Sequence, residues 1–500
     1  MEMEEGDLQK LRSPHGSLSV PVVLVVAVLM DKFQHRDAYL ERSFSVGVRS
    51  TENKGSHLVA LKAFRPGDTV LRSRPYAFEI FPELREERCN ECFRRPAEGI
   101  SLLRCSSCKI TRYCGKECQA RAWKRSHKYE CSLQRELEDR FGSLPSSVYI
   151  DVTIIIRIAI LLMSGKAVNA MSSDDYVQDH DDVKAMIDHM AQMRKSNAQE
   201  FAGNQEIVRI AEHLLDMLQA RSPKGLDWSL KPTEEELLKV LCKFACNNFS
   251  HAARQIWDDL IVSHGMGVYP LGAILNHSCK PNCVIYYHPE THEQEFRCIE
   301  DIQVGEDICH SYIDLAAVSK TRKEKLQSTY YFDCDCQCCK FPEELDNKLG
   351  ARDGKVTEKC DRAAELLAAA GSRTEIEHAL SRLKDLDENV LADRGNVDLD
   401  RLSVKSKMLQ ASIELGMMDS AIRACKQVVE GYRGIYPPLH PLLGLQLYTL
   451  GNLLFDDGRG EEAADVLQEG QKILLATHDR RSTMVQGITE LLAEARKVHR

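Results

Sequence analysis

The chain lacks the glycine-rich loops with which common folds bind nucleotides. Neither a G-x-G-x-x-G run nor a G-x-x-x-x-G-K-[ST] loop occurs in its 500 residues. Such loops bring the backbone close to phosphate groups and place those groups at a helix N-terminus. Their absence excludes a Rossmann dinucleotide-binding domain and a P-loop NTPase.

The chain also lacks an excess of basic charge and a secretory signal. Its formal net charge is −9, which argues against nucleic-acid binding over the whole surface and suits recognition of basic, lysine-bearing substrates. The apolar run Val20 to Met30 is shorter than the roughly 18 residues that span a bilayer, and the residues before it are acidic rather than basic. We therefore expect no membrane segment, and we interpret residues 1–43 as an N-terminal extension.

Cysteine is abundant, and its spacing is typical of zinc ligands. Eight residues form the pattern Cys89-x2-Cys92, Cys105-x2-Cys108, Cys114-x3-Cys118, His127-x3-Cys131. A structural zinc ion takes four such ligands in a tetrahedron, so the pattern suits two ions. Since zinc-binding thiolates need a reducing compartment, the 19 cysteines indicate a protein of the cytoplasm and the nucleus.

Three further motifs follow downstream. They are Asn276-His277-Ser278-Cys279-x-Pro281-Asn282-Cys283, then Gly305-Glu306-Asp307-Ile308-x-x-Ser311-Tyr312, then Tyr330-Tyr331-Phe332-Asp333-Cys334-Asp335-Cys336-x-x-Cys339. Cys334, Cys336 and Cys339 supply three thiolates, and Cys279 is the obvious fourth donor. A third zinc ion would then join the last motif to the first.

These patterns resemble known modules. The first cluster resembles a MYND zinc finger, and the downstream motifs in this order resemble the SET domain and post-SET segment of protein lysine methyltransferases. A MYND finger inserted into a SET domain is the mark of the SMYD family, and the resemblance runs from about Phe44 to the C-terminus. Finger ligands interleave in that family, which implies one zinc ion on Cys89, Cys92, Cys114 and Cys118 and another on Cys105, Cys108, His127 and Cys131.

The resemblance implies an α+β fold in which a SET β-fold is split by the finger. The expected segments are an N-terminal part of SET at 44–88, the MYND finger at 89–131, a linker and helical SET insertion at 132–246, the SET core at 247–315, a zinc-binding post-SET segment at 316–342 and an all-helical, tetratricopeptide-like domain at 343–500. Glycine turns at Gly416 and Gly458, each before a helical pattern, suit paired helices in the last segment. The family places this domain as a cap over the catalytic cleft.

The resemblance also implies an S-adenosylmethionine-dependent protein-lysine N-methyltransferase that acts on histone or non-histone proteins in transcriptional regulation. A lysine amine attacks a methyl group only when it is neutral, so the site must be narrow and poorly hydrated. Tyr330 and Phe332 would line that passage, and Tyr312 would orient the attacking nitrogen without carrying charge. Without the flanking motifs, Tyr330 and Phe332 would be interpreted as ordinary core aromatics and Tyr312 as a strand residue.

Contacts to S-adenosylmethionine are implied in several places along the chain. The residues are Lys54, Gly55 and Ser56, then Asn247 in a C-N-x-F segment, Asn276 and His277, and the aromatic residues Tyr312 and Phe332. An asparagine amide and a histidine imidazole together offer the donors and acceptors that an adenine edge and a carboxylate need. The competing interpretation of Asn276 and His277 is a polar, capped loop.

Two residues depart from the family pattern after Lys54. His57 stands where a second glycine is usual, and Val59 replaces a usual basic residue. A histidine at a position of positive φ costs on the order of 1 kcal/mol or crowds the ligand, so these changes predict reduced cofactor affinity. They favour an alternative function, a catalytically weak MYND and tetratricopeptide adaptor or transcriptional co-repressor, against which Tyr312, Asn276 and His277 argue.

Basic residues crowd the finger between residues 104 and 130, where eight of them stand against Glu117 and Glu130: Arg104, Lys109, Arg112, Lys116, Arg121, Lys124, Arg125 and Lys128. Two interpretations stay open, a face that binds DNA or an acidic partner and a solvated helix face. MYND fingers as a family bind proline-rich peptides, so Tyr113 and Trp123 belong either to such a groove or to the core of the finger. We expect a monomer that does not associate with membranes.

Overall fold

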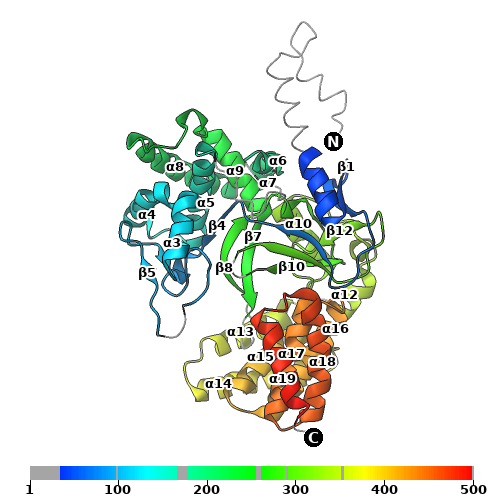
Figure 1. Ribbon diagram of the computed structural model, residues 1–500. Coiled ribbons are helices and arrows are strands. Elements are labelled where there is room, and N and C mark those ends of the chain that lie inside the picture. The colour runs from blue at the N-terminus through cyan, green and yellow to red at the C-terminus, as the bar shows by residue number, and fades with distance from the viewer. Residues whose placement is uncertain are drawn as a thin grey trace.

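The computed structural model describes residues 34–96, 99–165, 178, 180–187, 189–254, 261–288, 291–350 and 354–497. The apolar run Val20 to Met30, and most of the predicted N-terminal extension, lie outside these residues. Small sheets occupy the middle of the molecule, the finger and a group of helices lie on one side of them, and the C-terminal helices lie on the opposite side (Figure 1). The fold is α+β, as the sequence predicts.

Three small sheets pair strands from both sides of the finger. The first has the order β1 (Val46–Thr51), β2 (Gly55–Ala60), β12 (Asp307–His310) and β9 (Asn276–His277); the second has β10 (Cys283–Tyr287), β11 (Gln294–Cys298) and β3 (Thr69–Ser73); the third has β4 (Ala77–Ile80), β8 (Ile261–Val268) and β7 (Asn248–Arg254). Each sheet therefore joins a strand that precedes the finger to a strand that follows it. This pairing is the split β-fold that the sequence predicts.

The finger contains short elements around its cysteines. They are β5 (Leu103–Arg104), β6 (Arg112–Tyr113), α3 (Lys116–Ala122), a π-helical turn (Trp123–His127) and α4 (Lys128–Phe141). Because α4 continues ten residues beyond Cys131, the last ligand, the finger and the next segment share one helix. The predicted segment boundaries stay predictions.

A buried ionic network joins the finger to the sheets. Arg157 of α5 (Ser146–Met163) lies 2.7 Å from a carboxylate oxygen of Glu130 in α4 and 2.7 Å from one of Glu79 in β4. Burial alone would raise the pKa of Glu130, but the Arg157 charge outweighs it and lowers this pKa to about 2. Arg85, which is also buried, lies 3.3 Å from the other carboxylate oxygen of Glu79, so two buried cations and two buried carboxylates neutralise one another.

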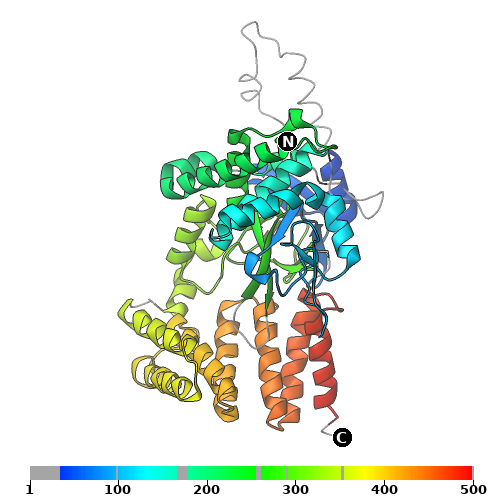
Figure 2. The same cartoon turned by 90° about the vertical axis from the view of Figure 1, so that its left-hand side faces the viewer.

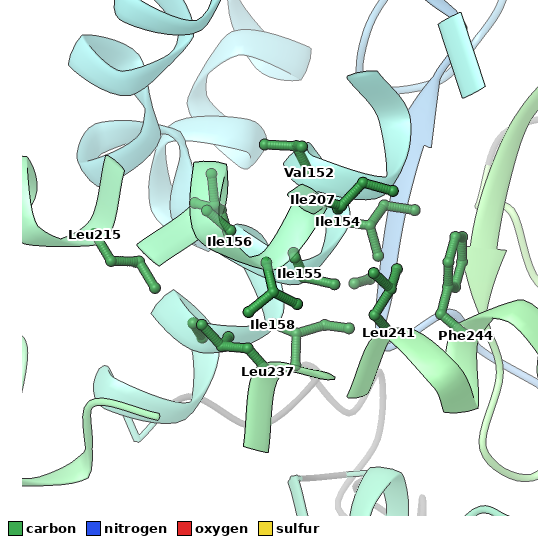
Figure 3. Close-up of a cluster of buried hydrophobic side chains, with 14 of the residues drawn as sticks. Val152, Ile154, Ile155, Ile156, Ile158, Ile207, Leu215, Leu237, Leu241 and Phe244 are labelled. Atoms are coloured by element: carbon green, nitrogen blue, oxygen red, sulfur yellow. The ribbon is translucent and has the colours of Figure 1, made fainter. Parts of the chain in front are cut away.

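The helical insertion packs around α5. Its other helices are α6 (His180–Ala185), α7 (Met190–Ser196), α8 (Ala198–Ala220) and α9 (Glu234–Asn247). α5 is long and apolar enough to cross a membrane, with a mean hydropathy of 2.0, yet 72% of it is buried inside the protein. Figure 3 shows its isoleucines packed against side chains of α8 and α9, so α5 is the central helix of a core.

The C-terminal part of the chain is mainly helical from Ser319 onward, and Figure 2 shows its last helices side by side below the sheets. The helices are α10 (Ser319–Tyr330), α11 (Gln337–Lys340), α12 (Glu343–Leu349), α13 (Gly354–Ala368), α14 (Arg373–Asp385), α15 (Leu399–Glu414), α16 (Met418–Ile435), α17 (Pro441–Asp456), α18 (Gly460–Thr477) and α19 (Thr483–Ala495). Gly416 and Gly458 have φ of +71° and +76° and precede α16 and α18, as the glycine turns predict. A Cβ at Gly451 would lie 2.3 Å from Leu467, so glycine there lets α17 and α18 pack closely.

Candidate active site and zinc clusters

Twelve cysteine and histidine side chains form three compact clusters. The sets are Cys89, Cys92, Cys114 and Cys118; Cys105, Cys108, His127 and Cys131; and Cys279, Cys334, Cys336 and Cys339, and within each set the ligand atoms lie within 4.8 Å of one another. Tetrahedral zinc with bonds of about 2.3 Å needs sulfur atoms about 3.8 Å apart. The sulfur atoms of Cys92 and Cys114 are 3.7 Å apart, and those of Cys105 and Cys131 are also 3.7 Å apart. The ligands interleave in the finger as the resemblance implies, and the three clusters suit three zinc ions.

The third cluster has a buried cation beside it. Arg322 in α10 is 1% exposed, and its Nε and Nη2 atoms have no hydrogen-bond partner within the described residues. Burial alone would lower the pKa of Arg322, but the nearby Cys279 and Cys339 sulfurs raise it. Four thiolates on one zinc ion carry net negative charge, so a guanidinium with unused donors fits a metal-bound state of this cluster.

A large cavity opens beside the third cluster. It has a volume of about 1710 Å³, and its lining includes every residue that the sequence predicts for the cofactor and for catalysis: Lys54, Gly55, Ser56, Asn247, Asn276, His277, Tyr312, Tyr330 and Phe332. These residues come from both sides of the finger. Among the described lining residues none lies beyond Gln337, but Tyr312, Tyr330 and Phe332 pack against a buried cluster that includes side chains of α15 and α16. The cap that the resemblance implies stays a prediction.

Tyr312 lies at the centre of the aromatic part of the cavity. Its hydroxyl donates a 2.6 Å hydrogen bond to the Leu275 carbonyl oxygen. Its ring centre lies 4.9 Å from that of Tyr330 and 6.3 Å from that of Phe332. Burial raises the pKa of Tyr312 well above its ordinary value, so the phenol stays neutral at physiological pH.

His277 and Asn276 are held by hydrogen bonds within the protein. The Tyr312 backbone N–H donates to His277 Nδ1 at 3.0 Å, and His277 Nε2 lies 3.3 Å from the Cys279 sulfur. Both imidazole nitrogens therefore already have partners. Asn276 Nδ2 donates to the Lys54 carbonyl oxygen at 2.8 Å and so holds the loop that contains Lys54.

Asn247 anchors another wall of the cavity. Its Nδ2 atom donates at 2.9 Å both to the Ile187 carbonyl oxygen and to the Lys243 carbonyl oxygen. Lys243 is 8% exposed, and its ammonium donates to the carbonyl oxygens of Val183 and Lys184 near the end of α6. The wall from Asp181 to Ile187 is therefore attached to α9, a role for Lys243 that no local pattern in the sequence indicates.

Asp307 is a cavity residue that the sequence did not single out. Its Oδ2 atom lies 2.5 Å from Lys54 Nζ, and this hydrogen bond raises the pKa of Lys54. The only sequence signal that pointed to Asp307 was its position in the Gly305-Glu306-Asp307 turn. The charge of Lys54 is thus already paired.

The two departures from the family pattern do not crowd the cavity. His57 is 4% exposed and Val59 is 1% exposed, and neither lines the cavity. His57 Nδ1 lies 3.0 Å from the Gly55 carbonyl oxygen, and the positive φ of the loop, +60°, belongs to Gly55. The geometric reason for expecting reduced cofactor affinity is therefore absent.

The basic residues of the finger are partly paired. Arg125 lies 2.6 Å from a Glu91 carboxylate oxygen, Arg121 lies 3.6 Å from the other, and Arg112 is bonded to Glu86. These pairs favour the interpretation of a solvated face, and DNA binding stays a prediction. Tyr113 is 1% exposed and belongs to the core of the finger, whereas Trp123 is 46% exposed.

The finger matches a known family model, and several known proteins are similar to this chain over most of its length. The family model described as the MYND finger matches residues 89–131. The histone-lysine N-methyltransferase SMYD3 of Homo sapiens is 26% identical over 446 residues, which cover 89% of this chain and 96% of the relative. The finger match and the similarity over most of the chain support the SMYD family.

Further SMYD-family relatives span most of the chain. The histone-lysine N-methyltransferase ASHR1 of Arabidopsis thaliana is 26% identical over 491 residues, with coverage of 90% of this chain and 95% of the relative. The N-lysine methyltransferase SMYD2-B of Danio rerio is 26% identical over 461 residues, with coverage of 89% and 96%. The similarity therefore includes the C-terminal helices as well as the finger and the sheets.

Proposed function

We propose that this chain is a protein-lysine N-methyltransferase, which transfers a methyl group from S-adenosylmethionine to the ε-amine of a lysine in a histone or non-histone protein. One observation carries the proposal. All nine residues predicted for cofactor contact and catalysis line a single cavity, although they lie in segments far apart in the sequence. The names of the relatives support the same reaction.

The cofactor supplies an electrophilic methyl group when it is bound. The residues that would hold it are the loop of Lys54, Gly55 and Ser56 together with Asn247 and Asn276. Positive φ at Gly55 lets the backbone approach a ligand closely, and a Cβ there would be strained. The cavity of about 1710 Å³ exceeds the roughly 300–1,000 Å³ typical of a small-molecule site, which leaves room for a substrate side chain.

Tyr312, Tyr330 and Phe332 would prepare the lysine. Their rings exclude water around the amine, which disfavours its charged form and lowers its pKa. The Tyr312 hydroxyl uses its only proton on the Leu275 carbonyl oxygen, so the phenol oxygen can act only as an acceptor toward the substrate. An acceptor there can bind an amine N–H and so orient the nitrogen lone pair.

The substitution Tyr312→Phe tests the proposal, because it keeps the ring and removes the oxygen. We expect kcat for methyl transfer to histone to fall about 100-fold or more, while calorimetric binding of S-adenosylmethionine persists. Tyr286→Phe is the matched control, since Tyr286 lies in β10 and outside the cavity. If the parent protein neither binds S-adenosylmethionine nor transfers methyl groups, the result would support the adaptor function instead.

The adaptor function has lost its structural support, because His57 and Val59 do not line the cavity.

We propose further that the finger binds protein partners, including proline-rich peptides, that the protein acts in transcriptional regulation, and that it resides in the cytoplasm and the nucleus. Reduced thiolates in three clusters are consistent with those compartments. The monomeric state stays a prediction.

A further inference from the structure

His277 lies between the third cysteine cluster and Tyr312. On one side its Nε2 atom is 3.3 Å from the sulfur of Cys279. On the other side its Nδ1 atom is 3.0 Å from the backbone nitrogen of Tyr312. The imidazole is flanked by the rings of Tyr312 and Phe332, with ring centres 5.4 Å and 6.0 Å away.

The partners determine which nitrogen donates. A backbone N–H is always a donor, so Nδ1 must accept the hydrogen bond from Tyr312. The hydrogen of the neutral ring then lies on Nε2, where it points at the Cys279 sulfur. A zinc-bound cysteine is a thiolate, which is a good acceptor for that hydrogen. The ring thus has one orientation that satisfies both neighbours.

Tyr312 is held at two points by one short segment. Its hydroxyl bonds to the carbonyl oxygen of Leu275, and its N–H bonds to the side chain of His277. The same segment forms β9, which pairs in parallel with β12, the strand that ends two residues before Tyr312. The orientation of the phenol therefore depends on both ends of the residue, and His277 controls the backbone end.

We propose that the His277 side chain is a positioning residue that links the third zinc cluster to Tyr312, rather than a cofactor ligand through its ring nitrogens. The expected effect on methyl transfer rests on the proposed function, whereas the hydrogen bonds of His277 to Cys279 and Tyr312 do not. The cluster holds Cys279, Cys279 orients the imidazole, and the imidazole fixes the Tyr312 backbone. Metal binding at the cluster thereby determines where the phenol oxygen lies.

Two substitutions separate the two hydrogen bonds. Asn places its side-chain oxygen near the position of a histidine Nδ1, so His277→Asn keeps an acceptor for Tyr312 and removes the donor to Cys279. Gln reaches the position of Nε2, so His277→Gln keeps the donor and removes the acceptor. The zinc-loaded full chain is used for both, with tyrosine labelled by ¹⁵N.

Two readouts are expected to move separately. Hydrogen exchange of the Tyr312 amide should accelerate in His277→Gln and remain slow in His277→Asn, whereas release of one zinc ion to a chelator should accelerate in His277→Asn only. In methyl transfer, kcat should fall about 10- to 100-fold in His277→Gln and less in His277→Asn, with the Kd of S-adenosylmethionine changed less than kcat.

The outcomes are decisive in either direction. Equal effects of both variants on the Tyr312 amide, or an unchanged amide in His277→Gln, would overturn the inference. A large rise in the Kd of S-adenosylmethionine in both variants, with the amide unchanged, would identify the ring as a cofactor ligand. If the parent protein transfers no methyl group, the proposed function fails, yet the amide and zinc measurements still decide the role of His277.

Discussion

Lys54 and Asp307 form an ion pair of 2.5 Å at the edge of the cavity, and this pair joins the loop before β2 to the start of β12. The two residues are 253 positions apart. Asp307 also lies 3.7 Å from His57 Nε2, so one carboxylate faces both side chains. The loop that would hold the cofactor is therefore anchored by a charge on the other side of the finger.

Asp307→Asn should loosen that loop with little effect on global stability. Lys54 is about half exposed, so the pair contributes under about 1 kcal/mol to the free energy of unfolding. Cofactor affinity should nevertheless weaken by roughly three- to tenfold, because the loop must be ordered on binding. Calorimetry measures the Kd, and Asp216→Asn, which removes an exposed ion pair with Lys231 outside the cavity, is the control. An unchanged Kd would contradict this role.

Arg157→Met should strongly destabilise the junction between the finger and the sheets. The change leaves the buried Glu130 carboxylate without its ion-pair partner, whereas Glu79 keeps Arg85 at 3.3 Å, and an uncompensated buried charge costs about 3–5 kcal/mol. Urea unfolding followed by circular dichroism measures the loss. Arg209→Met removes an exposed ion pair with Glu206 and should change stability by less than about 0.5 kcal/mol. Similar losses of unfolding free energy in the two variants would show that burial does not decide how much an ion pair contributes.

Acid should weaken the contact between the C-terminal helices and the sheets through His478. Burial lowers the pKa of His478 from 6.5 to about 4, and its ring lies 5.3 Å from that of Tyr286. In the unfolded chain His478 has its ordinary pKa and binds a proton more tightly than in the folded protein. The contribution of neutral His478 to the free energy of unfolding is therefore complete above pH 6.5 and declines by on the order of 2 kcal/mol as pH falls toward 4.

The variant His478→Asn isolates that contribution. Unfolding free energies of the parent and the variant are compared from pH 7 to pH 4.5, and the parent should show the steeper decline. Loss of zinc at low pH affects both proteins equally, so it cancels in the difference. Parallel profiles would show that His478 does not carry the effect.

Zinc analysis should distinguish the clusters. The parent should contain three zinc ions per chain, and both Cys334→Ser and Cys114→Ser should contain two. Cys334→Ser should also abolish cofactor binding, because Cys334 and Phe332 line the cavity, whereas no described lining residue belongs to the finger. Elemental analysis and calorimetry measure these quantities. Three zinc ions in Cys334→Ser would refute the ligand set.

Local spacing made part of the structure predictable. Cysteines two to four residues apart bring their sulfur atoms together whatever the surrounding fold, and all twelve predicted ligands lie in the three predicted sets. The glycine turns at Gly416 and Gly458 were predictable for a similar reason, since a positive φ before a helix favours glycine. The contact of Tyr436 in the C-terminal domain with Asp314 was not predictable in this way, because it depends on packing between domains.

The sequence by itself determined the zinc ligands, the split sheet and nine of the residues that line the cavity, since these follow from short motifs, their order and the family resemblance that they carry. Only the tertiary structure decided what those residues do to one another. Lys54 is paired by Asp307, Asn247 holds Ile187, and His277 uses both ring nitrogens inside the protein. The physical reason is that most of these contacts join residues distant in the chain, so each depends on how strands and helices pack and not on local spacing.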